Sequence, residues 1–288
     1  MRYEGSVYRP PSEAYSLIVQ ITVGCSHNGC TFCNMYKEKK FHIHTLDEVL
    51  EDLAEARSMY NYIDRIFLAD GDALIYKTED LISILDYIKE YIPECRRVSS
   101  YATPRSLLLK TQEELDLIRK HGLAFLYLGL ESGCDEILKA RNKGATSAEI
   151  VNAGQKAKKA GYDLSVTILS GLGGKELMEK HALDTAKAIS EMKPDYIGEM
   201  TLNIIPGTKL YEERAAGSFV MPEPVEILEE TKLMIKNIDD EGAVFRSNHI
   251  SNYVNIRGTF NEGREDMIRQ IDDAIKQNSF KVRHYTNM

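Results

Sequence analysis

The chain has 288 residues, with 36 Lys and Arg residues against 44 Asp and Glu residues, and a formal net charge of −8. This length suffices for one large α/β domain or two smaller ones, and the acidic balance without a basic stripe disfavours phosphate-driven binding of nucleic acid. The N-terminal residues lack the apolar core of a secretory signal, and no stretch approaches the roughly 18 apolar residues of a membrane span. We expect a cytoplasmic protein that binds neither nucleic acid nor a membrane.

From residue 16 onward, short runs rich in Ile, Leu, Val, Phe and Tyr alternate with amphipathic stretches. Such runs are typical of strands that are buried on both faces of a parallel sheet. The pattern predicts strands at residues 16–24, 64–70, 96–102, 123–130, 162–171 and 195–205.

The stretches between these runs carry start and stop signals for helices. Thr45 followed by Glu48 is a capping box, and Gly122 and Gly161 end two later stretches. Helices are predicted over residues 45–60, 77–93, 111–122, 147–161 and 176–194. Repeated βα units predict parallel strands with right-handed crossovers, as a partial (β/α)6 TIM-type barrel or an open doubly wound sheet. Both folds bind ligands at the carboxyl ends of their strands.

The pattern changes after residue 222, to a helix at 224–238, a polar strand-and-loop segment, and a last helix at 262–277. We interpret residues 1–222 as a core domain. Residues 223–288 are then a C-terminal α/β extension that packs on the barrel, where it could cover a substrate.

Unusual residues collect after each expected strand, where a ligand site is expected. The run "KEKK" at residues 37–40 is the densest local charge, and we expect it to be a solvated loop without function. The segments that follow the strands are, in chain order, "CSHNGCTFC", "DGDAL", "TPRS", "ESG", "GLGGKE" and "PGT".

Three cysteines, Cys25, Cys30 and Cys33, lie within nine residues after the first strand. A disulfide would leave one thiol over and does not suit a reducing compartment. Structural zinc needs four ligands, and His27 could be the fourth. A [4Fe–4S] cluster held by three thiolates would keep one iron open to a substrate or cofactor, which is the interpretation that we favour. Phe32 would then be an apolar wall beside the cluster.

With these motifs the sequence resembles the radical S-adenosylmethionine (radical SAM) superfamily over about residues 15–220. The likeness is strongest to the branch that contains oxygen-independent coproporphyrinogen oxidase and the Elongator-type proteins. One departure is the spacing CxxxxCxxC, since the common family pattern has three residues in the first gap. The resemblance implies a cluster on the three cysteines, SAM on the open iron, and an electron donor such as flavodoxin or ferredoxin. It implies reductive cleavage of SAM to methionine and a 5′-deoxyadenosyl radical, which abstracts hydrogen from a small molecule.

The resemblance also implies contacts to the methionine part of SAM. Gly71 and Asp72, in "ADGDAL", match the segment that receives the amino group, although a DG pair is also common in tight turns. Lys143, in "RNKG", falls where relatives place a basic residue for the carboxylate, and it could equally be a solvated residue before a turn.

For the nucleoside part of SAM, Glu131 in "GLESG" matches a family contact to the ribose hydroxyls, and a carboxylate can accept two hydrogen bonds from a diol. Thr167 matches a second ribose contact, although an inward threonine in a barrel is ordinary. The segment whose backbone edges meet adenine corresponds to Ile204, Ile205, Pro206 and Gly207.

Substrate contacts must come from the barrel interior and the extension. An arginine there would favour a carboxylate or phosphate substrate through paired hydrogen bonds. The candidate catalytic residues are His27, Tyr101, Arg105, Arg246 and His249.

A rival hypothesis is a non-catalytic radical SAM relative that carries heme or an iron–sulfur cluster, because the coproporphyrinogen-oxidase branch includes a heme-carrying protein. A heme would need an accessible ligand. The histidines near the expected site are His27, His42, His44 and His249.

Overall fold

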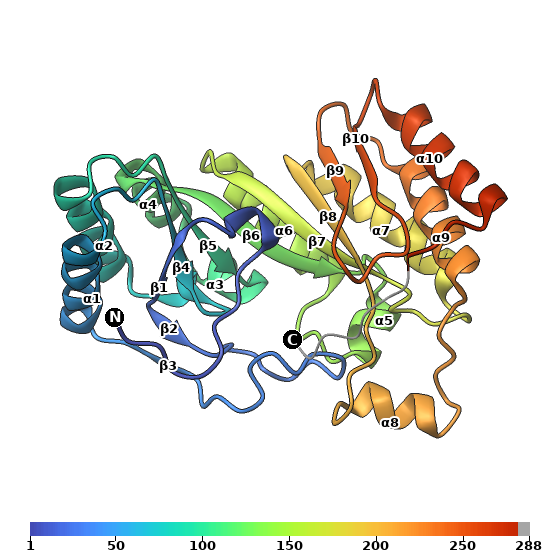
Figure 1. The fold of residues 1–288 in the computed structure, drawn as a ribbon, viewed down its shortest axis with the longest axis horizontal. Coiled ribbons are helices and arrows are strands. Elements are labelled where there is room, and N and C mark those ends of the chain that lie inside the picture. Colours follow the sequence, from blue (N-terminus) through green and yellow to red (C-terminus); the bar gives the residue numbers. More distant parts are fainter. Residues whose placement is uncertain (282–288) are drawn as a thin grey trace. The chain divides into compact units, whose positions relative to one another are not determined.

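The structure is a computed structural model that describes residues 1–281 (Figure 1). It divides into two compact units. The first comprises Met1–Asn28, Met35–Leu128 and Lys156–Leu164. The second comprises Gly29–Asn34, Gly129–Gln155 and the residues from Ser165 onward. The cysteine loop therefore contributes residues to both units.

The first unit is built on parallel strands that pair in the order β1, β4, β5 and β6. Helices α1, α2 and α4 lie side by side against them (Figure 1). The strands are β1 (Leu17–Gln20), β2 (Thr22–Val23), β3 (His42–Ile43), β4 (Arg65–Ala69), β5 (Arg97–Ala102) and β6 (Leu123–Glu131). The helices are α1 (Leu46–Met59), α2 (Thr78–Tyr91), α3 (Pro104–Leu109) and α4 (Gln112–His121), with 3-10 turns at Pro11–Glu13 and Ala73–Ile75.

In the second unit, β8 pairs in parallel with β7 and β9, and β10 runs antiparallel to β9. Helix α9 packs against both α7 and α10. The strands are β7 (Asp163–Ser170), β8 (Tyr196–Thr201), β9 (Val244–Ser247) and β10 (Ile256–Thr259). The helices are α5 (Asp135–Ala140), α6 (Ser147–Lys159), α7 (Met178–Met192), α8 (Lys209–Ala215), α9 (Pro224–Asn237) and α10 (Arg264–Gln277).

All of the expected strands are present, but two differ in extent. The run at 16–24 is broken at Ile21 into β1 and β2. The last run ends at Thr201, four residues early. The Thr201 N–H donates to Asn252 Oδ1 at 2.6 Å. The capping box of Thr45 and Glu48 is confirmed at the start of α1.

Sequence reasoning missed the short helices α3, α5 and α8. They have six, six and seven residues, which is too short for an apolar period of 3.6 to be recognised. Segment "TPRS", which follows the third expected strand, is the start of α3, where the Thr103 hydroxyl accepts the N–H of Ser106 at 3.0 Å.

The core of the second unit contains buried ionisable groups from three elements. Glu230 Oε1, on α9, accepts the N–H of Gly171 at 2.7 Å and lies 3.7 Å from His181 Nε2 on α7. Burial, together with the nearby Glu199 on β8, raises the pKa of Glu230 to about 8, against the opposing effect of the hydrogen bond from the Gly171 N–H. Burial also lowers the pKa of His181 to about 4. Both groups therefore favour their neutral forms near neutral pH.

The raised pKa of Glu230 makes the stability of the fold pH-dependent. A carboxyl group with a folded pKa of about 8 binds a proton more tightly than in the unfolded chain, so its contribution to stability is lost as the pH rises from about 5 to 8. We expect Glu230→Gln to flatten this decline and to raise the free energy of unfolding at pH 8 by about 1–2 kcal/mol. Urea unfolding at several pH values measures this change. The exposed neighbour Glu229→Gln is the control, and an unchanged pH slope in Glu230→Gln would contradict the assignment.

Candidate functional site

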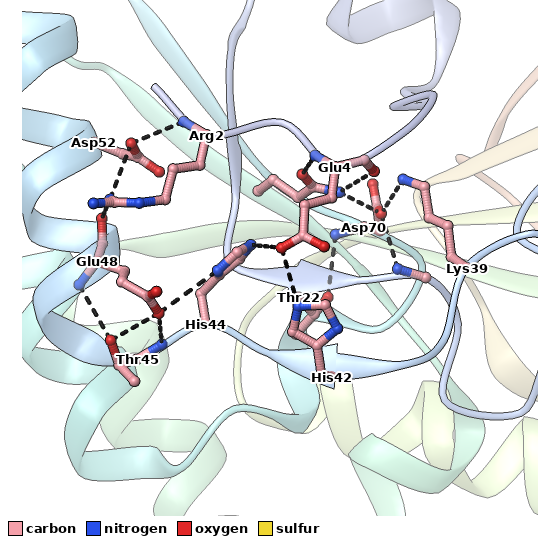
Figure 2. A network of polar contacts seen from close by, with 12 residues as sticks. Arg2, Glu4, Thr22, Lys39, His42, His44, Thr45, Glu48, Asp52 and Asp70 are labelled. Atoms are coloured by element: carbon pink, nitrogen blue, oxygen red, sulfur yellow. Dashed lines mark hydrogen bonds and ion pairs between the residues drawn. The ribbon is translucent and has the colours of Figure 1, made fainter.

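The carboxylate of Asp70, directly after β4, is fully buried and ties together three segments of the first unit (Figure 2). Its Oδ2 atom accepts hydrogen bonds from Gln20 Nε2 at 2.7 Å, from the Gly24 N–H at 2.9 Å and from Lys39 Nζ at 2.7 Å. Gly24, with a φ of +81°, immediately precedes Cys25. Asp70 therefore fixes the point at which the cysteine loop leaves the sheet.

Lys39 corrects one expectation from the sequence. The run "KEKK" was expected to be solvated, but the Lys39 side chain is only 7% exposed and forms the buried ion pair with Asp70. Its ammonium also lies 5.4 Å from the ring centroid of Tyr36. The charge run therefore supplies a buried counter-ion.

The second aspartate of the turn, Asp72, forms no ion pair among residues 1–281. Its Oδ2 atom accepts hydrogen bonds from the hydroxyls of Ser26 and Thr103, the latter at 3.1 Å. Burial raises the pKa of Asp72. The Oδ1 atoms of Asp70 and Asp72 are both buried and accept no hydrogen bond from the residues that the structure describes. Two acceptor atoms are thus left for a donor from outside the chain.

Gly71, between these aspartates, lies against the start of the cysteine loop. Its N–H donates to the Gly24 carbonyl at 3.0 Å. A Cβ atom added at Gly71 would lie 2.9 Å from Tyr36 Cε2 and 3.2 Å from the Cys25 Cβ atom. Only glycine allows this close approach, which brings the two aspartates to the first cysteine.

The cysteine loop is held separately in each unit. In the first unit, Asn28 adopts a φ of +43° and donates its side-chain N–H to the Tyr36 carbonyl at 2.8 Å. In the second unit, the N–H of Thr31 donates to the Arg141 carbonyl at 3.0 Å, and the Leu210 N–H donates to the Thr31 carbonyl at 3.1 Å.

The three thiols of this loop are partly exposed. Cys25 belongs to the first unit, and Cys30 and Cys33 belong to the second. Phe32, between the latter two, packs against an apolar cluster of the second unit that includes Ile204. Phe32 therefore anchors its part of the loop to the apolar core of the second unit. Its expected place as a wall beside an iron–sulfur cluster stays a prediction.

Glu131 and Lys143, two expected SAM contacts, form an ion pair in the second unit, with Lys143 Nζ 2.9 Å from Glu131 Oε1. Glu131 has a φ of +62°, a left-handed conformation that non-glycine residues rarely adopt. A Cβ atom at Gly129 would clash with Glu131 Oε1 and would lie 2.9 Å from Lys143 Nζ. Gly129 thus makes room for the two side chains to meet above the end of β6.

The remaining expected SAM contacts are less tightly constrained. Thr167 is half-buried on β7, opposite Gly198 of β8. Ile204 is buried in the same apolar cluster as Phe32, and Ile205 is half-buried. Pro206 and Gly207 are exposed in the turn before α8, where Gly207 has a φ of +83°.

The candidate catalytic residues of the first unit have different surroundings. His27 and Arg105 are exposed. Tyr101, on β5, lies in an aromatic group, with its ring 5.0 Å from that of Phe67, and burial raises the pKa of its hydroxyl. Tyr101 is therefore a neutral side chain that packs among other rings.

The polar segment of the second unit is largely structural. Arg246 donates to the carbonyls of Phe245 and Gly258, at 2.8 and 3.1 Å. His249 Nδ1 lies 2.7 Å from the Ser251 hydroxyl, and burial lowers the pKa of the imidazole. A pocket nearby is lined by Leu202, Ile204, Arg214, Met221, Pro222, Glu223, Pro224 and Tyr253. Ile204, from the expected adenine segment, and Tyr253, from the polar segment between α9 and α10, thus line the same pocket.

Comparison with known proteins identifies the family. A model of the Radical SAM superfamily matches residues 19–188, so the chain belongs to this superfamily. The family uses a [4Fe–4S] cluster and S-adenosylmethionine.

The heme chaperone HemW of Buchnera aphidicola is 24% identical over 195 residues, which are 64% of this chain and 50% of that protein. The tRNA uridine(34) acetyltransferase of Methanocaldococcus infernus is 27% identical over 110 residues, 38% of this chain and 21% of that protein. The chain therefore spans half or less of the length of these curated relatives. Since one of them acts on tRNA, the absence of a nucleic acid partner stays a prediction.

Among solved structures, coproporphyrinogen III oxidase (HemN) from Escherichia coli has a TM-score of 0.56 and 18% identity, with coverage of 77% of this chain and 52% of that chain. This likeness confirms the expected α/β fold class, a partial barrel of alternating strands and helices. Within residues 1–281, the structure contains no helix that is long and apolar enough to cross a membrane.

The ion pair of Lys39 with Asp70 generates a prediction about stability. Lys39→Met leaves a buried carboxylate without its cation, although two N–H donors remain, so we expect a loss of about 2–4 kcal/mol in the free energy of unfolding. Urea denaturation measures this loss. Lys40→Met, at an exposed neighbour, is the matched control. The double variant Lys39→Met with Asp70→Asn should recover part of the loss, and a loss that persists in full would contradict a charge-based cause.

Proposed function

We propose that the chain is a radical SAM enzyme that holds a [4Fe–4S] cluster on Cys25, Cys30 and Cys33. Bound there, the cluster and SAM would supply reductive cleavage to methionine and a 5′-deoxyadenosyl radical, which abstracts hydrogen from a small molecule. The observation that carries this proposal is the pair of buried Oδ1 atoms of Asp70 and Asp72 that accept no hydrogen bond within residues 1–281, on either side of Gly71 where it lies against Cys25. A flavodoxin or ferredoxin type of protein would be the electron donor.

The charges at the turn after β4 fit the amino group of SAM. Asp70 already has the ammonium of Lys39, whereas Asp72 accepts hydrogen bonds from neutral groups that include the Ser26 and Thr103 hydroxyls. A ligand ammonium would give Asp72 its missing cation and would favour its ionised form. The backbone of Gly71 would let that ligand approach closely, because this position has no side chain.

The ion pair of Glu131 and Lys143 fits the other charged and polar parts of SAM. We propose that Lys143 holds the methionine carboxylate and that Glu131 accepts hydrogen bonds from the ribose hydroxyls. Both side chains are only 13% exposed, so a bound ligand would be shielded from water. Thr167 and the segment from Ile204 to Gly207 would complete the nucleoside site.

The substrate site is proposed to include the pocket that Tyr253 and Arg214 line. Arg214 would suit a substrate with a carboxylate or phosphate group. Residues 223–288 would then cover this site as an extension of the core domain, residues 1–222. His27, Tyr101, Arg105, Arg246 and His249 remain the candidates for contact with the substrate.

A second candidate function is a heme carrier, which the likeness to the heme chaperone HemW favours. The two functions differ in their use of SAM. A carrier binds heme with a defined stoichiometry and need not release 5′-deoxyadenosine.

The proposed activity predicts a pattern among variants. After anaerobic reconstitution with iron and sulfide and reduction with dithionite, the wild-type chain should release 5′-deoxyadenosine from SAM. Cys30→Ala should lose both the visible absorption of the cluster and the cleavage, because a thiolate ligand is lost. Glu131→Gln should keep the cluster but bind SAM about tenfold more weakly, through loss of charge-assisted hydrogen bonds.

The control for Glu131→Gln is Glu136→Gln, an exposed carboxylate on α5 that pairs with Lys180. It should match the wild-type chain in cluster content and SAM affinity. A wild-type chain with a full cluster and no 5′-deoxyadenosine, together with stoichiometric heme binding, would replace the enzyme proposal by the carrier. Stoichiometric zinc on the cysteines would overturn both.

A further inference from the structure

Three side chains of the first unit, outside the cysteine loop, form a group suited to a metal ion: Glu4, His42 and His44 (Figure 2). One potential ligand atom from each lies within 4.8 Å of the other two. His42 and His44 are two residues apart at β3, so their side chains leave the same side of the chain, and their ring centroids are 5.5 Å apart. Glu4 joins them from the N-terminal segment.

The imidazole of His44 has a buried nitrogen that a metal ion could bind. Its side chain is 6% exposed, and its buried Nε2 atom has no hydrogen-bond partner among the described residues. Glu4 Oε1 lies 3.6 Å from this atom, beyond hydrogen-bond distance, and 3.1 Å from His42 Nε2. A buried polar nitrogen without a partner is costly, and a metal ion between the three atoms would satisfy it.

The other nitrogen of the His42 ring is oriented by a hydrogen bond. His42 Nδ1 lies 3.0 Å from the Lys40 carbonyl, which directs Nε2 toward Glu4, the usual arrangement behind a metal-binding histidine. A bound metal ion would replace the proton between His42 Nε2 and Glu4 Oε1. His44 Nδ1 lies 3.7 Å from Glu48 Oε2, beyond hydrogen-bond distance, so this carboxylate adds negative charge beside the ring without fixing its proton. Glu48 is itself held in place by the capping box of α1.

The cationic side chains of Arg2 and Lys39 form ion pairs with carboxylates other than Glu4 and Glu48. Arg2 pairs with Glu51 and lies 3.3 Å from Asp52, and Lys39 pairs with Asp70. Glu4 and Glu48 therefore give the group a negative balance that suits a cation.

We propose that Glu4 Oε1, His42 Nε2 and His44 Nε2 bind a divalent transition metal ion, with Zn²⁺ as the best match. Tetrahedral zinc with bonds of about 2.0–2.1 Å holds its ligand atoms about 3.4 Å apart, close to the 3.1 and 3.6 Å separations from Glu4. Two imidazoles and one carboxylate leave a fourth position for water. Glu4 and His42 are about half exposed, so this position is open to solvent.

The metal would fasten the N-terminal segment to β3, and a chain of hydrogen bonds already links the same segment to Asp70. The Glu4 N–H donates to Gln20 Oε1 at 2.8 Å, and Gln20 Nε2 donates to Asp70 Oδ2 at 2.7 Å. The inference rests on these residues alone and does not depend on the proposed enzymatic activity.

A Co²⁺ titration tests the site on the full, tag-free chain with its cluster reconstituted and loose metal removed. In the difference spectrum against the same chain without Co²⁺, the wild-type chain should bind one Co²⁺ with weak d–d bands and without a new thiolate-to-cobalt charge-transfer band. His44→Ala and Glu4→Gln should each weaken binding at least tenfold. His121→Ala is the matched control, because His121 also lies beside a single carboxylate, that of Asp86 at 2.6 Å.

Two further measurements separate the outcomes. A full chain with Cys25, Cys30 and Cys33 all replaced by Ser should keep the Co²⁺ site, since no thiolate takes part. Glu4→Gln changes a half-exposed side chain, so it tests the site even if His44→Ala does not fold. Zn²⁺ should raise the unfolding temperature of the wild-type chain and of His121→Ala more than that of Glu4→Gln. Equal affinity in the wild-type chain and Glu4→Gln, or loss of binding in the serine variant, would overturn the proposal.

Discussion

The buried carboxylate of Asp70 is the interaction on which the site depends. Its three donors come from β1, from the residue before the cysteine loop, and from the charged run after that loop. Asp70 lies 31 to 50 residues further along the chain than these donors, so its carboxylate joins the end of β4 to the segments on both sides of the cysteine loop. Because a buried carboxylate must be paired and hydrogen-bonded, the same contacts that stabilise the fold also place Gly71 against Cys25.

Asp72 shows how neighbouring aspartates can differ in role. Asp70 is compensated by Lys39 within the chain, whereas Asp72 is held by hydroxyl groups and has its pKa raised by burial. In the proposed SAM site, a ligand ammonium would supply Asp72 with a paired cation. Glu131 and Lys143 would each bind a group of the ligand in place of part of their ion pair.

The sequence predicted the order of strands and helices because buried parallel strands and amphipathic helices have distinct periods. It also predicted the family's cofactors from the spacing of three thiols, whereas the role of each cysteine as a cluster ligand stays a prediction. It could not reveal the role of Lys39, because a charge run looks the same whether it is solvated or buried. Nor could it pair Glu4 with His42 and His44, because β3 has two residues and the contact is made only when the N-terminal segment folds back.

The two metal-binding groups proposed for this chain would differ in the chemistry of their ligands. Thiolates favour iron–sulfur clusters, whereas imidazole and carboxylate favour harder divalent ions such as Zn²⁺. The shared link through Gln20 joins them, because one amide side chain binds both the Glu4 backbone and Asp70. A metal on the histidines would restrain Glu4, and through Gln20 it would restrain the carboxylate that positions the cysteine loop. The kind of ligand would then determine which metal each site binds. The hydrogen bonds from Glu4 through Gln20 to Asp70 would couple the two sites.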